Sequence, residues 1–200
     1  GIGKMIKQQI DQGAFQLEMD YYVQMVVAAA CDCRMGGGQV SAMTVLGSGN
    51  QGFEAILPVA ASAKYLHLDE EKTLRAVMMS ILITIYIKYH VGRLSPICGA
   101  TLSGAAASGA IGGTTEQIEG AIQNMLGNLS GMICDGAKEG CALKLSNCAG
   151  EAVLSAKLSM NNRIIQQTDG IISGSVEDTI RNVAELSKEG MSKVDMNIIH

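Results

Sequence analysis

The sequence predicts an all-α protein, and three features of its composition carry that prediction. Aromatic residues make up only 4% of the 200 residues and tryptophan is absent, which disfavours an aromatic-rich β-sandwich or barrel. The chain instead contains 24 glycines, 12 methionines and abundant alanine. Small side chains let helix backbones approach each other, and methionine fills the irregular gaps between them. We therefore expect one compact, mainly α domain over residues 1–200, with a buried Gly/Ala-rich central helix and glycine-rich loops.

The first quarter of the chain combines one long helical pattern with glycine-rich breaks. Residues 6–30 are rich in Gln, Glu, Met and Ala and contain no proline, which favours a helix. The segment 31–38 contains three consecutive glycines and is expected to end that helix. Residues 40–46 form a short run with a mild preference for a strand, and residues 47–52 form a tight glycine-rich loop.

Two further helices are expected in the middle of the chain. Residues 53–66 have a helical pattern, in which Pro58 is tolerated only near the first turns. Residues 68–71 provide an acidic start, which suits the helix dipole, for a helix that runs to about Tyr89. The apolar part of this helix, residues 77–87, is shorter than the ~20 residues that span a membrane. We therefore expect no membrane span here.

The second half of the chain is expected to be helical as well. Residues 94–115 carry no charge but consist mostly of Gly, Ala, Ser and Thr, which favours a buried central helix over a membrane span. The remaining elements, in order, are a helix start at Thr115 and Glu116, a helix over 118–129, a loop over 131–140, a helix over 141–160, and a capping box at 175–178 that opens a helix over 179–191.

Charge and cysteine content restrict the classes of function. With 15 basic and 19 acidic residues the net charge is −4, so no basic field exists for nucleic acid or an anionic membrane. Six cysteines are too few for a disulfide scaffold. No signal peptide is recognisable, which predicts the cytoplasm, where clustered cysteines more often indicate a metal or catalysis than crosslinks. The chain does not begin with Met, and we expect residues 1–3 to be either an added segment or the result of an internal cut, which would make the natural protein longer.

The loop Gly47–Gly52 matches the dinucleotide-binding pattern G-x-G-x-x-G, and Glu70 and Glu71 lie near the spacing of a ribose-binding acid. That interpretation requires strands that alternate with helices, and the sequence downstream shows none. Backbone N–H groups at the start of the next helix can instead hold a carboxylate or a phosphate. A plain turn that needs glycine for positive φ is the structural alternative.

Three cysteines stand in glycine-containing segments. Cys134 and Cys141 are seven residues apart with glycines between them, so they can turn toward one point, and Cys98 lies in an Arg-Leu-Ser-Pro-Ile-Cys-Gly segment. The spacing matches neither zinc knuckles nor ferredoxins, and buried cysteines often pack as small apolar residues. Metal binding and packing therefore both stay open on spacing alone. The other thiols are expected in the core or an interface: Cys31, Cys33 and Cys148.

Several cations lie beside these segments. Arg34, Arg93 and Lys144 flank glycine or cysteine residues, where they can receive a substrate carboxylate or balance an anionic cluster. A solvated surface position is the alternative. His67 and His90 each stand alone and are expected to satisfy local hydrogen bonds rather than to bind metal.

Five segments, in this order, resemble the C-terminal part of the serine dehydratase α-chain-like family, which includes L-cysteine desulfidases and UPF0597-type proteins. They are residues 32–37, 47–52, 93–98, 130–137 and 141–144. The resemblance covers nearly the whole chain. Because full-length relatives are roughly twice as long, it implies that an N-terminal half of the same protein is missing and acts as a partner.

The resemblance also implies an all-α fold and an oxygen-sensitive [4Fe–4S] cluster. The implied reaction is β-elimination from L-cysteine or L-serine without pyridoxal phosphate, which gives pyruvate, ammonia and, from cysteine, sulfide. The small amino-acid substrate would be held by Ser48, Gly49, Asn50 and Gln51, with Arg34 and Lys144 as further candidates. The cluster ligands would be Cys98, Cys134 and Cys141.

Some questions remain open at this level. The resemblance assigns no general base, because the family's proposed base lies in the absent half. Cysteine and serine are not distinguished as substrates, and a homo-oligomer is left open. The alternatives to a lyase are a nucleotide-binding module that uses the loop 47–52 and a non-catalytic helical interaction domain.

Overall fold

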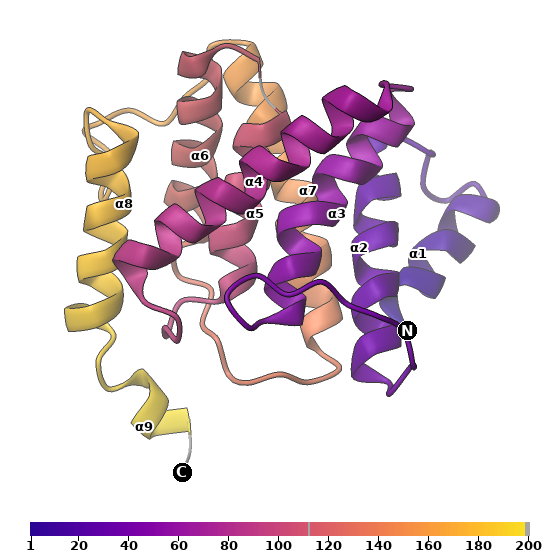
Figure 1. Ribbon diagram of the computed structural model, residues 1–200, viewed down its shortest axis with the longest axis horizontal. Helices are drawn as coiled ribbons and strands as arrows, with labels where there is room; N and C mark the ends of the chain where they lie inside the picture. Colours follow the sequence, from indigo (N-terminus) through magenta and orange to yellow (C-terminus); the bar gives the residue numbers. More distant parts are fainter. Residues whose placement is uncertain (112, 199–200) are drawn as a thin grey trace.

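The computed structural model describes residues 1–111 and 113–198, and this part of the chain is all-α (Figure 1). No β-strand occurs in it, and the only strand-like pairings are single bridges between Val45 and Ser48 and between Ile97 and Ile133. The predicted fold class is therefore confirmed. The helices are α1 (Ile2–Asp11), α2 (Met19–Met35), α3 (Gly49–Tyr65), α4 (Glu70–Val91), α5 (Gly99–Ile111), α6 (Thr115–Leu129), α7 (Cys141–Met160), α8 (Val176–Glu185), a π-helical turn η1 (Leu186–Gly190) and α9 (Val194–Ile198).

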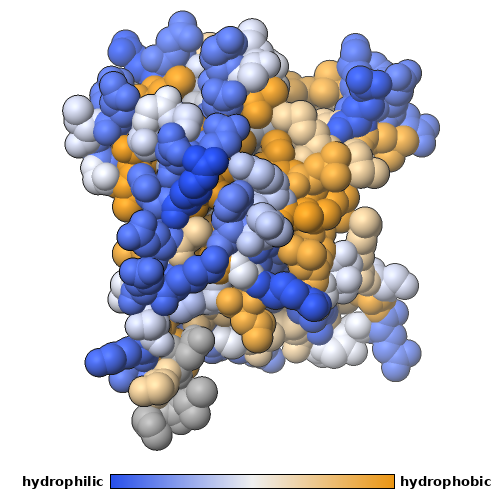
Figure 2. All heavy atoms as spheres, turned by 60° about the vertical axis from the view of Figure 1, so that its left-hand side comes forward, coloured by the Kyte–Doolittle hydropathy of each residue, from blue (hydrophilic) through white to orange (hydrophobic). Residues whose placement is uncertain are grey.

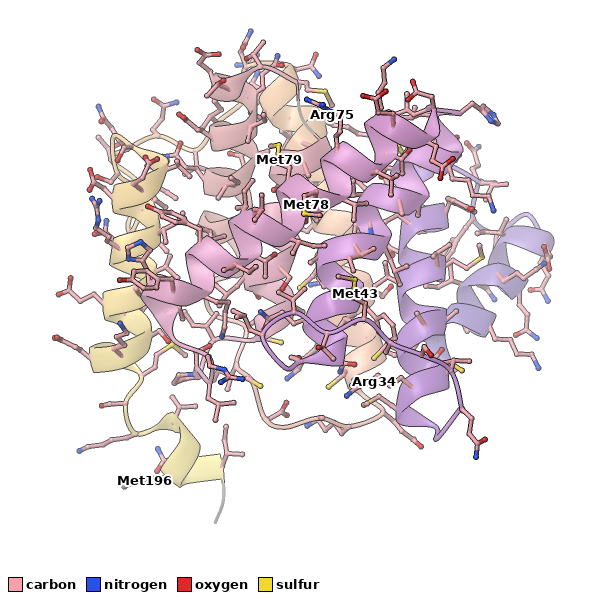
Figure 3. All side chains as sticks on the ribbon, viewed as in Figure 1. Arg34, Met43, Arg75, Met78, Met79 and Met196 are labelled. Carbon is pink, nitrogen blue, oxygen red and sulfur yellow. The ribbon has the colours of Figure 1, made fainter. Side chains whose placement is uncertain are left out.

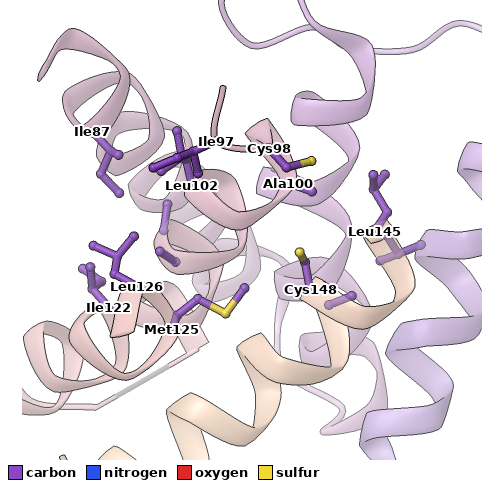
Figure 4. Close-up of a cluster of buried hydrophobic side chains, with 14 of the residues drawn as sticks. Ile87, Ile97, Cys98, Ala100, Leu102, Ile122, Met125, Leu126, Leu145 and Cys148 are labelled. Atoms are coloured by element: carbon purple, nitrogen blue, oxygen red, sulfur yellow. The ribbon is translucent and has the colours of Figure 1, made fainter. Parts of the chain in front are cut away.

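Helix α5 is the buried centre of the bundle, as its composition predicts. Every residue from Ala100 to Gly109 is buried, and α3, α4, α6 and α7 pack around the helix. Its small residues allow this close packing, because a Cβ on Gly104 would overlap the terminal methyl group of Met125 on α6. Figure 4 shows the large apolar side chains that fill the core around α5, among them Leu102, Leu126 and Leu145.

The first predicted helix is in fact two helices. The chain leaves α1 after Asp11, turns at Gly13 with a φ of 74°, and enters α2 at Met19. Helix α2 then continues through both cysteines of the segment 31–38, which was expected to break it, and ends at Met35. Gly37, with a φ of 81°, supplies the turn that follows.

The glycine-rich loop also differs from its prediction. Residues 40–46 do not form a strand, and α3 begins at Gly49, four residues before the expected start. Ser48 caps this helix, because its hydroxyl accepts the N–H of Gln51 at 3.3 Å. Most of the loop is therefore the first turn of α3, which places Pro58 inside the helix rather than near its start. The βαβ unit that a dinucleotide site requires is not found in the described residues.

Other boundaries agree closely with the sequence. Asp69 caps α4 by accepting the N–H of Lys72 at 2.9 Å, and α7 spans the predicted residues. Ser175 caps α8 by accepting the N–H of Asp178 at 3.1 Å, so this helix begins three residues before the predicted 179.

Helix α4 has one face in the core and one face exposed. Its exposed apolar side chains recur at helical spacing and include Leu74, Met78, Leu82, Tyr86 and Tyr89. Figure 2 shows a face on which a band of hydrophobic side chains lies between hydrophilic ones. In the described part of the chain α4 alone is long and apolar enough to cross a membrane, with a mean hydropathy of 1.3, a criterion that core helices of other proteins also meet.

Candidate functional site

The N-terminal ends of α3, α5 and α7 lie at one end of the bundle, beside the C-terminal end of α2 (Figure 1). Each helix N-terminus leaves backbone N–H groups without intrahelical partners and carries a partial positive charge. All six substrate candidates and all three ligand candidates from the sequence lie on these helix ends or on the loops beside them. This end of the molecule therefore suits an anionic ligand.

Cys98 and Cys134 are held together by backbone pairing. The bridge between Ile97 and Ile133 places the two segments antiparallel, with the Cys98 N–H donating to the carbonyl of Met132 at 2.8 Å. The Cys134 N–H donates to the carbonyl of Pro96 at 2.7 Å. Two residues far apart in the sequence are thus fixed beside each other.

The two thiols also interact directly. A hydrogen bond between them raises the pKa of Cys98, as does burial, and lowers the pKa of Cys134 below the ordinary thiol range, against the effect of burial. Hydrogen bonding from the backbone N–H of Ala100, at the start of α5, acts to lower the pKa of Cys98, and that from Gly136 acts to lower the pKa of Cys134. Because such bonds favour the thiolate, this pair can carry negative charge.

Cys141 is the first residue of α7 and is buried. Its sulfur accepts the N–H of Lys138 at 3.4 Å and donates its proton toward the carbonyl of Gly136 at 3.5 Å. The thiol therefore holds the loop 134–140 against the helix end. Since that loop begins at Cys134, it connects Cys141 to the thiol pair.

The three cysteines suit a metal cluster in their chemistry but do not already converge as its ligands. In residues 1–111 and 113–198, no group of three or more His, Cys, Asp or Glu side chains already converges as metal ligands do. The donor chemistry nevertheless fits, because all three candidates are thiols, two of them fixed side by side by the bridge between Ile97 and Ile133, and the sulfur of Cys141 accepts the N–H of Lys138. N–H groups directed at sulfur are the feature by which proteins stabilise and tune thiolate-bound clusters.

The other cysteines occupy different environments. Cys31 and Cys148 are buried, as expected, but Cys33 is exposed on α2 and is not a core thiol. Burial, followed by the nearby charge of Cys141, raises the pKa of Cys31 to about 12. Cys148 donates toward the sulfur of Met132 at 3.7 Å. Cys31 and Cys148 thus lie close behind the three candidate ligands (Figure 4 shows Cys98 and Cys148).

Arg34 joins α2 to the glycine-rich loop. Its Nη1 donates to Oδ1 of Asn50 at 2.7 Å, and the Cys31 thiol donates to the same oxygen at 3.8 Å. A Cβ on Gly49 would lie 2.7 Å from Nε of Arg34, so glycine is needed for this approach. In Figure 3, Arg34 and Met43 lie at the same end of the bundle. The structure therefore brings Arg34 together with the loop, as the sequence suggested.

Gln51 connects the loop to the cysteines. It is buried, its Nε2 has no hydrogen-bond partner in the described residues, and its Oε1 lies 2.9 Å from the position of a Cβ on Gly99. Gly99 directly follows Cys98. A buried amide donor without a partner is unusual and suits a ligand that would accept its hydrogen bond.

The ammonium of Lys144 is already engaged by other groups of the chain. Its Nζ donates to the carbonyl of Ile133 at 2.7 Å and pairs with Asp135, which also pairs with Lys138. These two lysines hold the pKa of Asp135 below its usual range. Burial opposes the charge of Lys144, but Asp135 and the nearby thiols raise its pKa overall. Lys144 is thus beside the cysteines, with its charge already engaged by a carboxylate.

Of the other singled-out side chains, Arg93 lies beside the glycine-rich loop, whereas the two histidines lie outside this arrangement. Arg93 is exposed, with Nη2 3.3 Å from the position of a Cβ on Gly47. His67 is exposed, and His90 packs edge-on against the rings of Tyr86 and Tyr89.

Sequence reasoning missed Lys88. This residue of α4 is 3% exposed, and its Nζ donates to Oγ of Ser95 at 3.3 Å. Burial lowers its pKa, and the charges of Cys134 and Cys98 oppose that change. A signal was available, because Lys88 shares the buried face of α4 with Ile81, Thr84 and Val91 at helical spacing.

Glu54 was missed as well. It lies one turn after Gln51 on α3, is 0% exposed, and neither carboxyl oxygen has a hydrogen-bond partner in the described part of the chain. Burial raises its pKa well above the usual range and so favours the neutral carboxyl. Its Oε1 lies 3.4 Å from the position of a Cβ on Gly104, and its charge would act on Cys31 and Cys148.

Comparison with known proteins identifies the family. The profile of the family "Serine dehydratase alpha chain" matches residues 1–200. A UPF0597 protein of Desulfotalea psychrophila is 43% identical over 204 residues, covering 100% of this chain and 47% of the relative. A UPF0597 protein of Clostridioides difficile is 43% identical over 205 residues, covering 100% of this chain and 48% of the relative. One from Bacteroides fragilis is 40% identical over 202 residues, covering 99% and 47%.

The chain thus spans about half the length of the curated relatives it matches. No solved structure matches it. The match over the whole chain agrees with the motifs around the glycine-rich loop and the cysteines. The chain belongs to the serine dehydratase alpha chain family.

Proposed function

We propose that this chain is the cluster-binding portion of an iron–sulfur lyase that eliminates the β-substituent of L-cysteine or L-serine. The products are pyruvate and ammonia, with sulfide from cysteine. The family relationship supports a lyase-type enzyme. The observation that carries the proposal is that the bridge between Ile97 and Ile133 holds Cys98 and Cys134 side by side, while the sulfur of Cys141 accepts the N–H of Lys138 in the loop that begins at Cys134.

In this proposal Cys98, Cys134 and Cys141 hold a [4Fe–4S] cluster. A cluster bound by three thiolates supplies an iron with an open position, which acts as a Lewis acid toward the substrate. The chain's own contribution is electrostatic. The N-terminal ends of α5 and α7, with the N–H groups of Ala100, Gly136 and Lys138, stabilise negative charge on the sulfurs.

Residues of the glycine-rich loop bind the amino-acid substrate. Gln51 offers a buried N–H donor, and the first turn of α3 offers backbone N–H groups for a carboxylate. Arg34 orients Asn50 through its hydrogen bond, so both act together with Ser48 and Gly49. Lys144 lies on the other side of the cysteines, where its bond to Asp135 orders the loop 134–140.

The remaining expectations are part of the same proposal. Residues 1–200 act as one domain in the cytoplasm, without nucleic acid or membrane as partners. The other half of the longer relatives supplies the general base. The assay on both amino acids decides whether the natural substrate is cysteine or serine. The measured mass of the loaded protein decides whether copies of the chain associate.

Anaerobic reconstitution with iron and sulfide tests the proposal. We expect brown protein with about four irons and four acid-labile sulfides per chain, the composition of one [4Fe–4S] cluster. Pyruvate and sulfide would then be assayed on L-cysteine and L-serine with the protein extended to the length of its relatives. Colourless protein without bound iron after reconstitution would refute the assignment.

A further inference from the structure

Lys88 is a positive charge buried inside the bundle. Its side chain is on the core-facing side of α4, and the residue is 3% exposed. Among the residues that the structure describes, its ammonium bonds only to the neutral hydroxyl of Ser95, at 3.3 Å, and forms no ion pair with a carboxylate. Burial of an unpaired ammonium is strongly unfavourable. A negative partner is therefore expected nearby.

The surroundings of Lys88 show where that partner lies. Ser95, which accepts from Lys88, donates to the carbonyl of Ile97 at 2.9 Å, and Cys98 is the next residue. The bridge between Ile97 and Ile133 holds Cys98 beside Cys134. Lys88 is thus linked through the hydroxyl of Ser95 to the backbone directly before the cysteine pair.

The second lysine at the site is in a different position. Lys144 reaches the cysteines from α7, but its charge is balanced by Asp135 at the surface. Lys88 has no such carboxylate in the described part of the chain. Of these two lysines, only Lys88 therefore depends on an anion at the cysteine site to neutralise its charge.

We propose that Lys88 is a positioning residue of the cysteine site, whose ammonium provides the counter-charge for the anion held by Cys98 and Cys134. In the metal-free chain the ammonium makes the potential at the two sulfurs more positive, which favours the approach of an anionic reagent. In the loaded protein the anion is the cluster, and this second part rests on the proposed function. The residue does not touch the substrate.

Charge-selective alkylation tests the metal-free part. Iodoacetate and iodoacetamide form the same bond to sulfur, but only iodoacetate is anionic, so the ratio of their rates reports the local potential. The rates are measured at Cys134 by peptide mass spectrometry, with the exposed Cys33 as an internal reference. The variants are Lys88→Met and Lys88→Arg, with Lys72→Met as the matched control.

Lys72 is an exposed lysine of the same helix, 16 residues earlier, or about 24 Å along the axis. We expect the ratio at Cys134 to fall about fivefold in Lys88→Met, as removal of one nearby charge predicts. It should stay unchanged in Lys72→Met and recover in Lys88→Arg. An unchanged ratio in folded Lys88→Met overturns the proposal. Should that variant not fold, the wild-type ratio decides: an excess at Cys134 over Cys33 supports the proposal, and equality overturns it.

The loaded protein gives an independent readout. We expect the midpoint potential of the cluster to be lower in Lys88→Met than in wild type, because loss of a positive charge disfavours the reduced form, and to be unchanged in Lys72→Met. If alkylation responds but wild-type protein binds no cluster, the role of Lys88 stands and the proposed function fails. If the cluster forms and neither the ratio nor the potential changes, the proposed function stands and the role of Lys88 fails.

Discussion

The two sides of the cysteine site are built in opposite ways. On the α5 side, Cys98 is buried, and the cation nearby, Lys88, bonds to Ser95 and has no carboxylate partner in the described residues. On the α7 side, Cys134 begins a loop whose cation, Lys144, is paired with Asp135, and these side chains are 25% and 31% exposed. The first side is fixed by the close packing of small residues. The second is fixed by ion pairs and sulfur contacts at the surface, which water and salt weaken.

This difference shows how one site can combine rigidity with adjustment. The buried α5 side determines where a ligand binds, because tightly packed core residues do not shift easily. An exposed loop can change its contacts at little cost in free energy. We therefore expect substitutions on the α5 side, and on α3 packed against it, to have larger effects than substitutions in the loop 130–140.

The largest expected effect is on metal binding. Cys98→Ser should lower the iron content after reconstitution at least about tenfold, because it removes a proposed ligand from the rigid side. The matched control is Cys33→Ser, at the exposed cysteine of α2, which should keep wild-type iron content. Iron and acid-labile sulfide are measured under anaerobic conditions. Equal iron content in both variants would show that Cys98 only packs.

The next effect is on stability and compares two glycines. A Cβ on Gly52 would overlap the carbonyl oxygen of Met43, which is backbone and cannot move aside. Gly52→Ala should therefore lower the free energy of unfolding by about 3 kcal/mol. Gly131 in the exposed loop has no atom near such a Cβ, so Gly131→Ala should change it by less than about 0.5 kcal/mol. Urea unfolding of the metal-free chain measures both.

A pH-dependent effect is expected from Glu54. Because burial raises the folded-state pKa of this carboxyl, the unfolded chain releases the proton first as the pH rises above about 4.5. The stability of the wild type is then lost progressively with increasing pH, by at most about 1.4 kcal/mol per pH unit from this group. Glu54→Gln should remove this contribution and be more stable than wild type at neutral pH, but not at pH 4.

Urea unfolding between pH 4 and pH 8 measures this profile. Glu139→Gln, at an exposed carboxyl of the loop, is the control and should follow the wild-type profile. A parallel shift of the Glu54→Gln curve at all pH values, without a change of slope, would mean that the buried carboxyl is not held neutral.

The smallest effect is expected at the surface of the loop. Asp135→Asn removes the ion pairs with Lys138 and Lys144 and should lower the thermal midpoint by no more than about 2 °C. Because these lysines hold the pKa of Asp135 below its usual range, the pairs persist in mild acid and are lost only as the pH falls further. If Asp135→Asn lowered the thermal midpoint as much as Gly52→Ala does in the same measurement, the distinction between the two sides would be contradicted.

The sequence predicted those parts of the fold that depend on local signals. The acidic start of α4, the bounds of α7 and the uncharged central helix were all predictable, because each follows from composition or from charge within a few residues. The division between α1 and α2 was not, since Gly13 alone gives little indication that a helix ends there. The early start of α3 was missed because glycines were taken as a loop.

The site was only partly predictable. Arg34 and the glycine-rich loop do meet, but the resemblance to a family, not the spacing, singled out Cys98, Cys134 and Cys141 together. Cys98 and Cys134 meet through a bridge between distant segments, which no local pattern encodes. Lys88 and Glu54 were missed because the burial of a charged side chain depends on which helices pack over it.

The contacts of Cys141 have a consequence for metal delivery. Its thiol proton is directed at Gly136, so loss of that proton on ligation would remove a bond that fastens the loop 134–140. Lys138, a trypsin cleavage point within that loop, would then differ in its susceptibility to proteolysis between the empty and the filled protein. Limited proteolysis at Lys138 would thus report whether metal is bound, independently of any spectroscopic signal.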